Sequence, residues 1–283
     1  MKINLAVVGD PISHSLSPVI HETVLQELGM DYSYRKIRVK KGELSAFLKS
    51  TDGLSLQGYN LTMPHKQDIM QHLDFIDEDA RMFNSVNTVK TDGNKLSGYN
   101  TDGKGCLLGM LDKGYECGDK NIVILGAGGV VSTIALKTAT EKAKKITILN
   151  RTLSSAQALA DNVYKQTGKE VIAATLTTEN MCEHCRDCDI LINGTPLGME
   201  GIDSDFSDFS FLKVLNPYAL VHDLIYNPQT TNLLTHANGM GLETLNGLGM
   251  LIYQGLLADE IFLETSIDLA FFKAKIEDKL KFF

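Results

Sequence analysis

The stretch NIVILGAGG, residues 121–129, decides the fold of the second half of this 283-residue chain. An apolar run enters a glycine-rich turn, and the helical pattern STIALKTATEKA follows it directly. Glycines at such a turn let the backbone approach a pyrophosphate, and the helix N-terminus presents unpaired N–H groups to it. The context therefore predicts a dinucleotide-binding unit, although a tight strand–helix turn also needs glycine for steric reasons.

The alternation of strand and helix patterns continues after this turn. The later strand candidates are KITILN (145–150), EVIAAT (170–175), DILING (189–194) and LVHDLIYN (220–227). Repeated strand–helix winding of this kind predicts a Rossmann domain, a doubly wound parallel sheet.

A second α/β layer precedes the glycine turn. Its strand candidates are INLAVV (3–8), YSYRKIRV (32–39) and LQGYNLT (56–62), separated by helical patterns, so we expect a largely parallel sheet here too. The segment after Gly247 reads as two helices without a strand. We predict an α/β protein with two domains. The first is residues 1–103, completed by C-terminal helices in 240–283 that pack back on it, and the Rossmann domain is 104–239.

Charge and composition exclude several classes of partner. With 27 basic and 35 acidic residues the net charge is −8, which argues against nucleic acid or an anionic membrane as a partner. No apolar run approaches the roughly 20 residues of a membrane span. Five cysteines at irregular spacing do not form a disulfide framework. We expect a cytoplasmic protein with reduced thiols.

The end of the strand at 145–150 indicates which dinucleotide binds. NAD sites place an acidic residue there for the ribose hydroxyls, whereas NADP sites use an arginine for the 2′-phosphate. Here the strand runs into Asn150, Arg151 and Thr152, and no acidic residue occurs between Glu141 and Asp161. A guanidinium pairs with phosphate through charge-assisted hydrogen bonds. The sequence favours NADP over NAD.

Polar clusters without a good core explanation occur in the first domain. They are SHSLS with Ser15 and Ser17, YNLTMPHK with Asn60, Thr62 and Lys66, SVNTV with Asn87, and GYNTDGKG with Asp102. Ser17 also suits a helix N-cap, a lone lysine is most often solvated, and GYNTDGKG reads as a turn. Together the hydroxyls, amides, ammonium and carboxylate suit a small polyhydroxylated molecule that bears a carboxylate.

A cysteine-rich segment, CEHCRDC, invites a metal interpretation. It contains Cys182, His184, Cys185 and Cys188 just before the strand at 189–194. A closed zinc site needs four ligands of suitable geometry, and neighbouring thiols also serve as small buried side chains. We expect no metal here.

The motifs SHSLSP, NLTMPHK, SVNT, NTDGKG, GAGG, NRT, INGTPLGM and NGLGMLIYQ occur in an order that resembles the shikimate dehydrogenase family over nearly the whole chain. The resemblance implies NADP-dependent, reversible reduction of 3-dehydroshikimate to shikimate in aromatic amino acid biosynthesis. A quinate/shikimate dehydrogenase using NAD or NADP is the alternative, and a non-catalytic NADP-binding sensor is a further one. The family resemblance is compatible with a monomer or a homodimer.

The resemblance also implies roles for individual residues. Lys66 and Asp102 match the catalytic pair, but which of them moves the proton stays open. We expect the Asp102 carboxylate to lie within hydrogen-bonding reach of Lys66, directly or through one water or substrate group. Matches to substrate-binding positions are Ser15, Ser17, Asn60, Thr62, Asn87, Tyr226 and Gln254. Matches to cofactor-binding positions are Gly126, Ala127, Gly128, Gly129, Asn150, Arg151, Thr152, Asn193, Thr195 and Met250.

The chain departs from the family pattern in the cofactor half. Ser154 and Ser155 stand where a second basic residue often follows NRT, and Val131 occupies a position that is often small. The absence of a basic residue at Ser154 and Ser155 predicts weaker binding of the 2′-phosphate.

Overall fold

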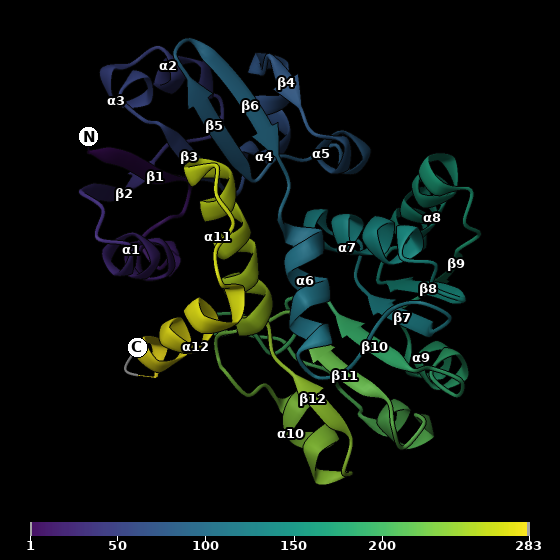
Figure 1. Ribbon diagram of the computed structural model, residues 1–283. Helices are drawn as coiled ribbons and strands as arrows, with labels where there is room; N and C mark the ends of the chain where they lie inside the picture. Colours follow the sequence, from purple (N-terminus) through teal and green to yellow (C-terminus); the bar gives the residue numbers. More distant parts are fainter. Residues whose placement is uncertain (1, 282–283) are drawn as a thin grey trace. The chain divides into compact units, whose positions relative to one another are not determined.

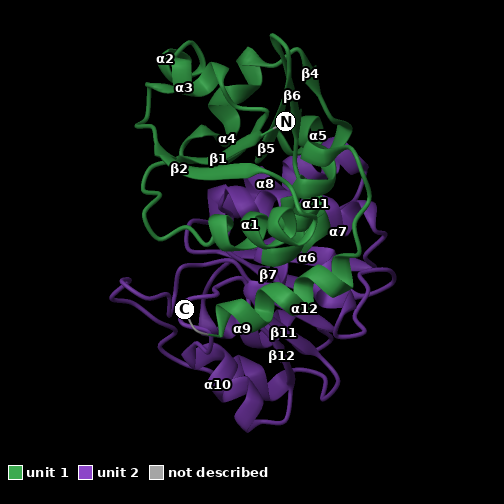
Figure 2. Ribbon diagram, turned by 60° about the vertical axis from the view of Figure 1, so that its left-hand side comes forward, with its two compact units in different colours: residues 1–105, 252–283 green, residues 106–251 purple. Residues whose placement is uncertain are grey.

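The computed structural model describes residues 2–281. The chain divides into two compact units, unit 1 (residues 1–105 and 252–283) and unit 2 (residues 106–251), coloured separately in Figure 2. The first boundary lies beside the one expected at residue 103, and the chain re-enters unit 1 at Ile252, later than the expected return near residue 240.

Unit 1 is built on a six-stranded sheet in the order β2-β1-β3-β5-β6-β4 (Figure 1). The β1–β2, β1–β3 and β4–β6 pairs are parallel, whereas β3–β5 and β5–β6 are antiparallel. The expected parallel pairing is present among β1, β2 and β3, and the sequence did not predict that β5 and β6 form an antiparallel hairpin, which turns at Gly93, whose φ is +58°. The strands are β1 (Ile3–Gly9), β2 (Tyr32–Arg38), β3 (Gly58–Leu61), β4 (Phe75–Ile76), β5 (Thr88–Asp92) and β6 (Lys95–Tyr99).

Side chains that alternate along each strand form the two faces of this sheet. On β1, Ala6 and Val8 belong to one core cluster with Tyr59 and Leu61, whereas Leu5 belongs to another with Tyr34 and Leu25. Successive side chains of a strand point to opposite faces. Asn60, between Tyr59 and Leu61, therefore points to the face of the sheet that carries Tyr34 and helix α1.

The helices of unit 1 include one whose start corrects a prediction. Leu16, not Ser17, is the N-cap of α1, and no side chain caps that end. Ser17 is the first helical residue, so its hydroxyl serves other contacts. The helices are α1 (Ser17–Glu27), α2 (Leu44–Leu48), α3 (Thr51–Leu54), α4 (His65–Asp68), the 3₁₀ turn η1 (Ile69–His72), α5 (Glu78–Phe83) and α12 (Leu269–Leu280), with parts of α6 (Asp102–Leu111) and α11 (Leu248–Leu263).

Unit 2 is a six-stranded sheet in the order β12-β11-β10-β7-β8-β9 (Figure 1). Every pair is parallel. This is the doubly wound order that the glycine turn predicts, so the fold class is confirmed. The strands are β7 (Asn121–Leu125), β8 (Lys145–Asn150), β9 (Ile172–Thr175), β10 (Ile190–Asn193), β11 (Leu220–Asp223) and β12 (Glu243–Leu245).

Helices cover the strands of unit 2 and close its core. The centre of one core cluster is formed by strand residues Val123, Leu191 and Val221, packed with Met181, Phe211 and Leu233 from the covering segments. The helical elements are α7 (Gly129–Thr140), α8 (Leu153–Thr167), α9 (Thr178–His184), the 3₁₀ turn η2 (Ser210–Val214) and α10 (Asn232–Gly239). None of the helices within residues 2–281 is long and apolar enough to cross a membrane.

Candidate active site

Lys66 and Asp102 form the central contact of unit 1. Lys66 lies in α4, directly after the Pro64 turn, and Asp102 is the first residue of α6. The Lys66 Nζ atom donates to Asp102 Oδ2 over 2.6 Å, and the two side chains are 22% and 9% exposed. The contact predicted between them is therefore present. The turn predicted at GYNTDGKG is wrong, because Gly98 and Tyr99 end β6 and a helix begins at Asp102.

Gly105 explains why this helix carries glycines. A Cβ atom placed on Gly105 would lie 2.8 Å from the backbone nitrogen of Gln254. Only glycine therefore permits the start of α6 to approach α11 this closely. The approach brings Gln254, far away in the sequence, to the site.

Asn87 is the centre of the polar groups around Asp102. Its Nδ2 atom donates to Asp102 Oδ1 over 2.8 Å, to Thr101 Oγ1 over 2.9 Å and to Gln254 Oε1 over 3.3 Å. Its Oδ1 atom accepts from the Thr88 hydroxyl over 2.9 Å and from the Thr101 N–H over 3.0 Å. Asn87 is 2% exposed, and buried amides keep their place when each polar atom is hydrogen-bonded.

Asn60 and the two serines continue these contacts. The Asn60 Nδ2 atom donates to Thr88 Oγ1 over 3.3 Å, and its Oδ1 atom accepts from the Tyr34 hydroxyl over 2.8 Å. The Ser15 hydroxyl donates to Ser17 Oγ over 3.1 Å, and Ser17 is close enough to Tyr34 to oppose the rise that burial causes in the pKa of its phenol. We call these polar residues the unit 1 network. Its members are Ser15, Ser17, Tyr34, Asn60, Lys66, Asn87, Thr88, Thr101, Asp102 and Gln254.

Thr62 is the predicted substrate residue of unit 1 that stands apart from the network. Its backbone N–H donates to Val8 over 3.0 Å, and a Cβ atom on Gly9 would lie 2.2 Å from its methyl carbon. Within residues 2–281 its hydroxyl has no hydrogen bond to a network side chain. Tyr226, which was predicted alongside it, belongs to unit 2, where burial raises the pKa of its phenol.

The glycine turn of unit 2 has the form of a phosphate cradle. Gly126 has a φ of +107°, and a Cβ atom there would lie 3.0 Å from the carbonyl oxygen of Gly194. Gly128 and Gly129, at the start of α7, have open space where a Cβ atom would be. No side chain caps this helix end, so its N–H groups face the space beside Ala127 and the glycines. The donors present fit the pyrophosphate of a dinucleotide.

The end of β8 presents the predicted phosphate-specificity residues to solvent. The Asn150 Nδ2 atom donates to the carbonyl oxygen of Thr152 over 3.0 Å, which fixes the bend between β8 and α8. Arg151 and Thr152 are exposed, and the Thr152 side chain does not cap α8. The guanidinium and the free N–H groups of the helix end are thus both open to an anion.

A buried carboxylate holds the loop after β10. The Asn193 Oδ1 atom accepts from the Thr195 N–H over 3.0 Å and from its hydroxyl over 2.7 Å. Asn193 Nδ2 in turn donates to Asp223 Oδ1 over 3.0 Å, and Thr231 donates to Asp223 Oδ2 over 2.6 Å. Burial raises the pKa of the Asp223 carboxyl, and these hydrogen bonds oppose that rise. Met250, the last predicted cofactor residue, is buried in the same unit.

Two family models and many curated relatives match this chain. The profile of the shikimate dehydrogenase substrate binding domain matches residues 7–89, and that of shikimate / quinate 5-dehydrogenase matches residues 111–198. The chain is 40% identical to a shikimate dehydrogenase (NADP(+)) of Alkaliphilus metalliredigens, covering 97% of this chain and 96% of the relative. The chain belongs to the shikimate dehydrogenase family.

Solved structures of family members have the same fold. A shikimate dehydrogenase in complex with NADP+ superposes with a TM-score of 0.87 at 35% identity, covering 98% of this chain and 96% of that one. The shikimate 5-dehydrogenase of Listeria monocytogenes, in complex with shikimate and NAD, gives 0.88 at 30% identity, covering 97% and 96%.

The structure accounts for one departure from the family pattern. Val131 is 1% exposed, and its Cγ2 atom lies 2.2 Å from where a Cβ atom on Gly194 would be. The valine occupies space that the glycine leaves vacant. The larger residue therefore packs beneath the turn without displacing the backbone that approaches the cofactor.

The cysteines of CEHCRDC take part in the core of unit 2. Cys185 and Cys188 are buried there, and burial raises the pKa of the Cys188 thiol well above its usual value. The Cys182 Sγ atom lies 3.6 Å from the Ser210 hydroxyl. No group of three potential metal ligands occurs among residues 2–281. Packing explains these thiols.

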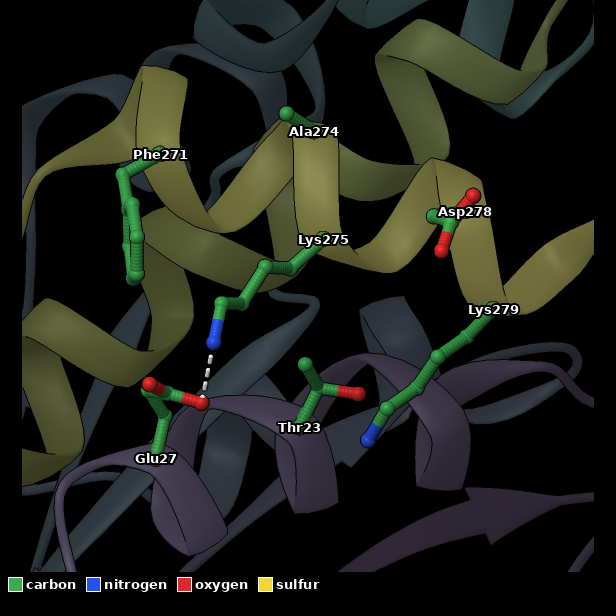
Figure 3. A pocket seen from close by; sticks show the side chains of 7 residues that line it. All are labelled: Thr23, Glu27, Phe271, Ala274, Lys275, Asp278 and Lys279. Atoms are coloured by element: carbon green, nitrogen blue, oxygen red, sulfur yellow. Dashed lines mark ion pairs between the residues drawn. The ribbon is translucent and has the colours of Figure 1, made fainter.

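A separate hollow of about 490 Å³ lies between α1 and α12 of unit 1 (Figure 3). Lys275 pairs with Glu27 across it at 2.5 Å, and its ammonium group lies 4.9 Å from the centre of the Phe271 ring. None of the predicted site residues lines it. Its opposite charges join the two helices, and we assign it no ligand.

Proposed function

We propose that this chain catalyses the reversible, NADP-dependent reduction of 3-dehydroshikimate to shikimate. The observation that carries the proposal is the 2.6 Å pair between Lys66 and Asp102, held inside a network of amides and hydroxyls. A non-catalytic NADP-binding sensor has no use for such a pair. The curated relative at 40% identity is a shikimate dehydrogenase (NADP(+)), which supports the same activity.

The unit 1 network has the composition that the substrate requires. Ser15 and Ser17 offer hydroxyls, while Asn60, Asn87 and Gln254 offer amides. Asn60 donates one hydrogen bond and accepts one within the protein, so its amide has a donor and an acceptor left for a ligand. The Asn87 amide is fully hydrogen-bonded within the protein, so it would exchange one of these contacts for the substrate. We infer that they hold the hydroxyls and the carboxylate of shikimate, with Thr62 as a further contact.

Lys66 and Asp102 handle the proton of the reacting hydroxyl. In the direction of shikimate oxidation, the hydroxyl loses its proton to the Lys66–Asp102 pair, which passes it on to solvent, as hydride leaves the carbon that bears the hydroxyl. The Lys66 ammonium stabilises the negative charge that develops on the oxygen, and the Asp102 carboxylate fixes the position of that ammonium. In the reverse direction the same pair returns a proton to the alkoxide. Because the two groups share one hydrogen bond, the proton belongs to the pair, and kinetics of single variants must divide their roles.

The residues of unit 2 fit NADP. When bound, the cofactor supplies the hydride chemistry. Gly126, Ala127, Gly128 and Gly129 would receive its pyrophosphate at the start of α7. Arg151, with Asn150 and Thr152, would receive the 2′-phosphate. Asn193, Thr195 and Met250 would line the nicotinamide end, and Asp223 holds Asn193 in place from behind.

We also propose a location and an assembly state for this chain. The cysteines are free thiols, which supports a cytoplasmic protein. We propose a monomer or a homodimer, which light scattering coupled to size-exclusion chromatography distinguishes.

A steady-state comparison tests the proposal. The purified chain is assayed with shikimate and with quinate, each with NADP+ and with NAD+, following formation of the reduced nicotinamide. We expect the largest kcat/KM for shikimate with NADP+. Faster turnover of quinate with NAD+ would assign the quinate/shikimate dehydrogenase activity instead, and no turnover of any pair would assign the sensor.

A further inference from the structure

Tyr34 lies in the middle of the unit 1 network, although nothing in the sequence distinguishes it from other strand residues. It is on β2, paired in register with Leu5 of β1, while Asn60 of β3 is paired with Val7 on the other side of the same strand. Tyr34 is only 8% exposed. Its side chain lies on the face of the sheet that carries α1.

The Tyr34 hydroxyl lies between two parts of the substrate site that have no hydrogen bond between them within the described chain. On one side is Ser17, which accepts from Ser15 at the start of α1 and opposes the rise that burial causes in the pKa of the Tyr34 phenol. On the other side the Tyr34 hydroxyl donates to Asn60 Oδ1 over 2.8 Å. From Asn60 onward, each residue donates a hydrogen bond to the next residue in the direction of Asp102. Asn60 donates to Thr88, Thr88 donates to Asn87, and Asn87 donates to Asp102.

This polarity matters because an amide has two orientations of similar shape. An asparagine that is rotated by half a turn exchanges a donor for an acceptor. Asn60 keeps its oxygen toward Tyr34 and its nitrogen toward Thr88 only while Tyr34 donates. Burial raises the pKa of the Tyr34 phenol well above its usual value, so the hydroxyl keeps its proton.

The Tyr34 ring is also held in place by a stacked histidine. The His21 imidazole stacks on it with ring centres 4.5 Å apart and planes 11° apart. His21 Nδ1 lies 2.7 Å from Asp259 Oδ1, and both side chains are fully buried. The Asp259 carboxylate on α11 therefore fixes the imidazole on α1, and the imidazole fixes the plane of the tyrosine.

We propose that Tyr34 is a positioning residue for the substrate, which sets the orientation of the Asn60 amide beside Ser17. The inference rests on the proposed function, since Asn60 and Ser17 are taken as substrate contacts. It assigns Tyr34 no contact with the reacting atoms. The expected signature is therefore weaker substrate binding with the chemistry retained.

Tyr34→Phe tests this, because it removes the hydroxyl and keeps the ring that stacks on His21. Removing a donor from a buried acceptor predicts that KM for shikimate rises about 10-fold. We expect KM for NADP+ and kcat to change by less than about 2-fold, since neither the dinucleotide turn nor the Lys66–Asp102 pair is touched. Calorimetric titration with shikimate measures the same loss without turnover.

The matched control is Tyr59→Phe. Tyr59 is on β3 of the same sheet, is 1% exposed, and points to the opposite face. Its KM for shikimate should equal that of the wild type. A double variant, Tyr34→Phe with Asn60→Ala, isolates the pathway. If Tyr34 acts through Asn60, adding Tyr34→Phe to Asn60→Ala raises KM for shikimate by less than about 2-fold beyond the value for Asn60→Ala alone.

The outcomes separate the inference from the proposed function. A Tyr34→Phe variant with wild-type KM and wild-type shikimate affinity overturns the inference while leaving the function intact. If the two substitutions raise KM for shikimate independently, so that their effects multiply in the double variant, Tyr34 does not act through Asn60. If the wild type binds shikimate without turning it over, and the Tyr34→Phe variant binds it more weakly, the proposed function is overturned and the positioning role is retained. A wild type that binds no shikimate overturns both.

Discussion

The two units hold their candidate ligand residues in opposite ways. In unit 1 the residues are buried and bonded to each other: Asn87 is 2% exposed, Asn60 6% and Asp102 6%. In unit 2 the residues that we propose to bind phosphate are exposed, as Arg151, Thr152, Gly128 and Gly129 all are. The buried carboxylate of that unit, Asp223, binds protein groups instead.

The difference follows from what each ligand demands. A small polyhydroxylated substrate is recognised by the direction of each hydrogen bond, which requires amides of fixed orientation. A phosphate is recognised by charge and by backbone N–H groups, which a helix end and a single arginine supply without a buried network. Unit 1 should therefore be sensitive to isosteric changes, whereas cofactor preference in unit 2 should depend on few exposed atoms.

The largest expected effect is at the centre of the network. Lys66→Ala should lower kcat for shikimate oxidation by ~10² or more, the usual scale for a positioned acid or base. Lys104→Ala is the matched control, because Lys104 is exposed in α6 two residues after Asp102. An unchanged kcat in a folded Lys66→Ala protein would remove Lys66 from the mechanism.

Acid stability probes His222, a buried polar group of unit 2 outside the proposed cofactor site. Burial lowers the pKa of His222 to about 4, so the unfolded chain takes up this proton first. Its contribution to stability is complete above the unfolded pKa of ~6.5 and is lost as the pH falls toward the folded value. Between pH 7 and pH 5 the free energy of unfolding should fall by about 2 kcal/mol through this group.

Denaturant titrations of the wild type and of His222→Leu at both pH values measure this difference. The leucine variant lacks the titrating group, so its stability should depend less steeply on pH. Equal pH dependence in the two proteins would show that His222 does not titrate in this range.

Cofactor preference gives the next effect in size. Arg151→Ala should lower kcat/KM for NADP+ about 10-fold, the scale of one hydrogen bond to a charged group near the surface. The value for NAD+ should stay within about 2-fold, since NAD+ lacks the 2′-phosphate. Lys165→Ala, an exposed change of the same charge farther along α8, controls for net charge. Equal losses with both cofactors would contradict the assignment of Arg151 to the 2′-phosphate.

The smallest effect concerns a polar atom of unit 1 that the network does not include. The Tyr59 hydroxyl is buried and has no hydrogen-bond partner among the described residues. Removing an unsatisfied buried hydroxyl relieves its desolvation cost, so Tyr59→Phe should raise the free energy of unfolding by up to about 1 kcal/mol. Chemical denaturation measures this. A loss of stability of similar size would indicate that the hydroxyl has a partner.

Sequence reasoning predicted the parts of the fold that repeat a local pattern. The strand–turn–helix at 121–129 and the strands that follow it were found from their apolar runs, which parallel strands buried on both faces make conspicuous. The β5–β6 hairpin was missed because Lys90, Asp92 and Lys95 give it a polar, half-exposed pattern. GYNTDGKG is typical of a turn because glycine gives the backbone freedom, whereas in the fold Gly105 allows helix α6 to pack against Gln254.

The residues of the candidate site also divide into those that a local motif predicts and those that only the fold reveals. Residues with polar chemistry in short motifs, such as Lys66, Asn87 and Asp102, could be predicted, and so could the Lys66–Asp102 contact. Tyr34, Thr88 and Asp223 could not, because each serves the site through a partner that only the fold brings near. Period-two alternation places Tyr34 on a face of a sheet, but it does not say that Asn60 lies on the same face two strands away.

Titration of shikimate into the cofactor-free protein tests the central claim most directly, namely that the buried network of unit 1 is a substrate site formed without the cofactor. We expect saturable binding with one site per chain, and affinity about 10-fold lower after Asn87→Ala, since that change leaves buried donors and acceptors unpaired. Binding of shikimate only after NADP+ has been added, or equal affinity in the Asn87→Ala protein, would contradict it.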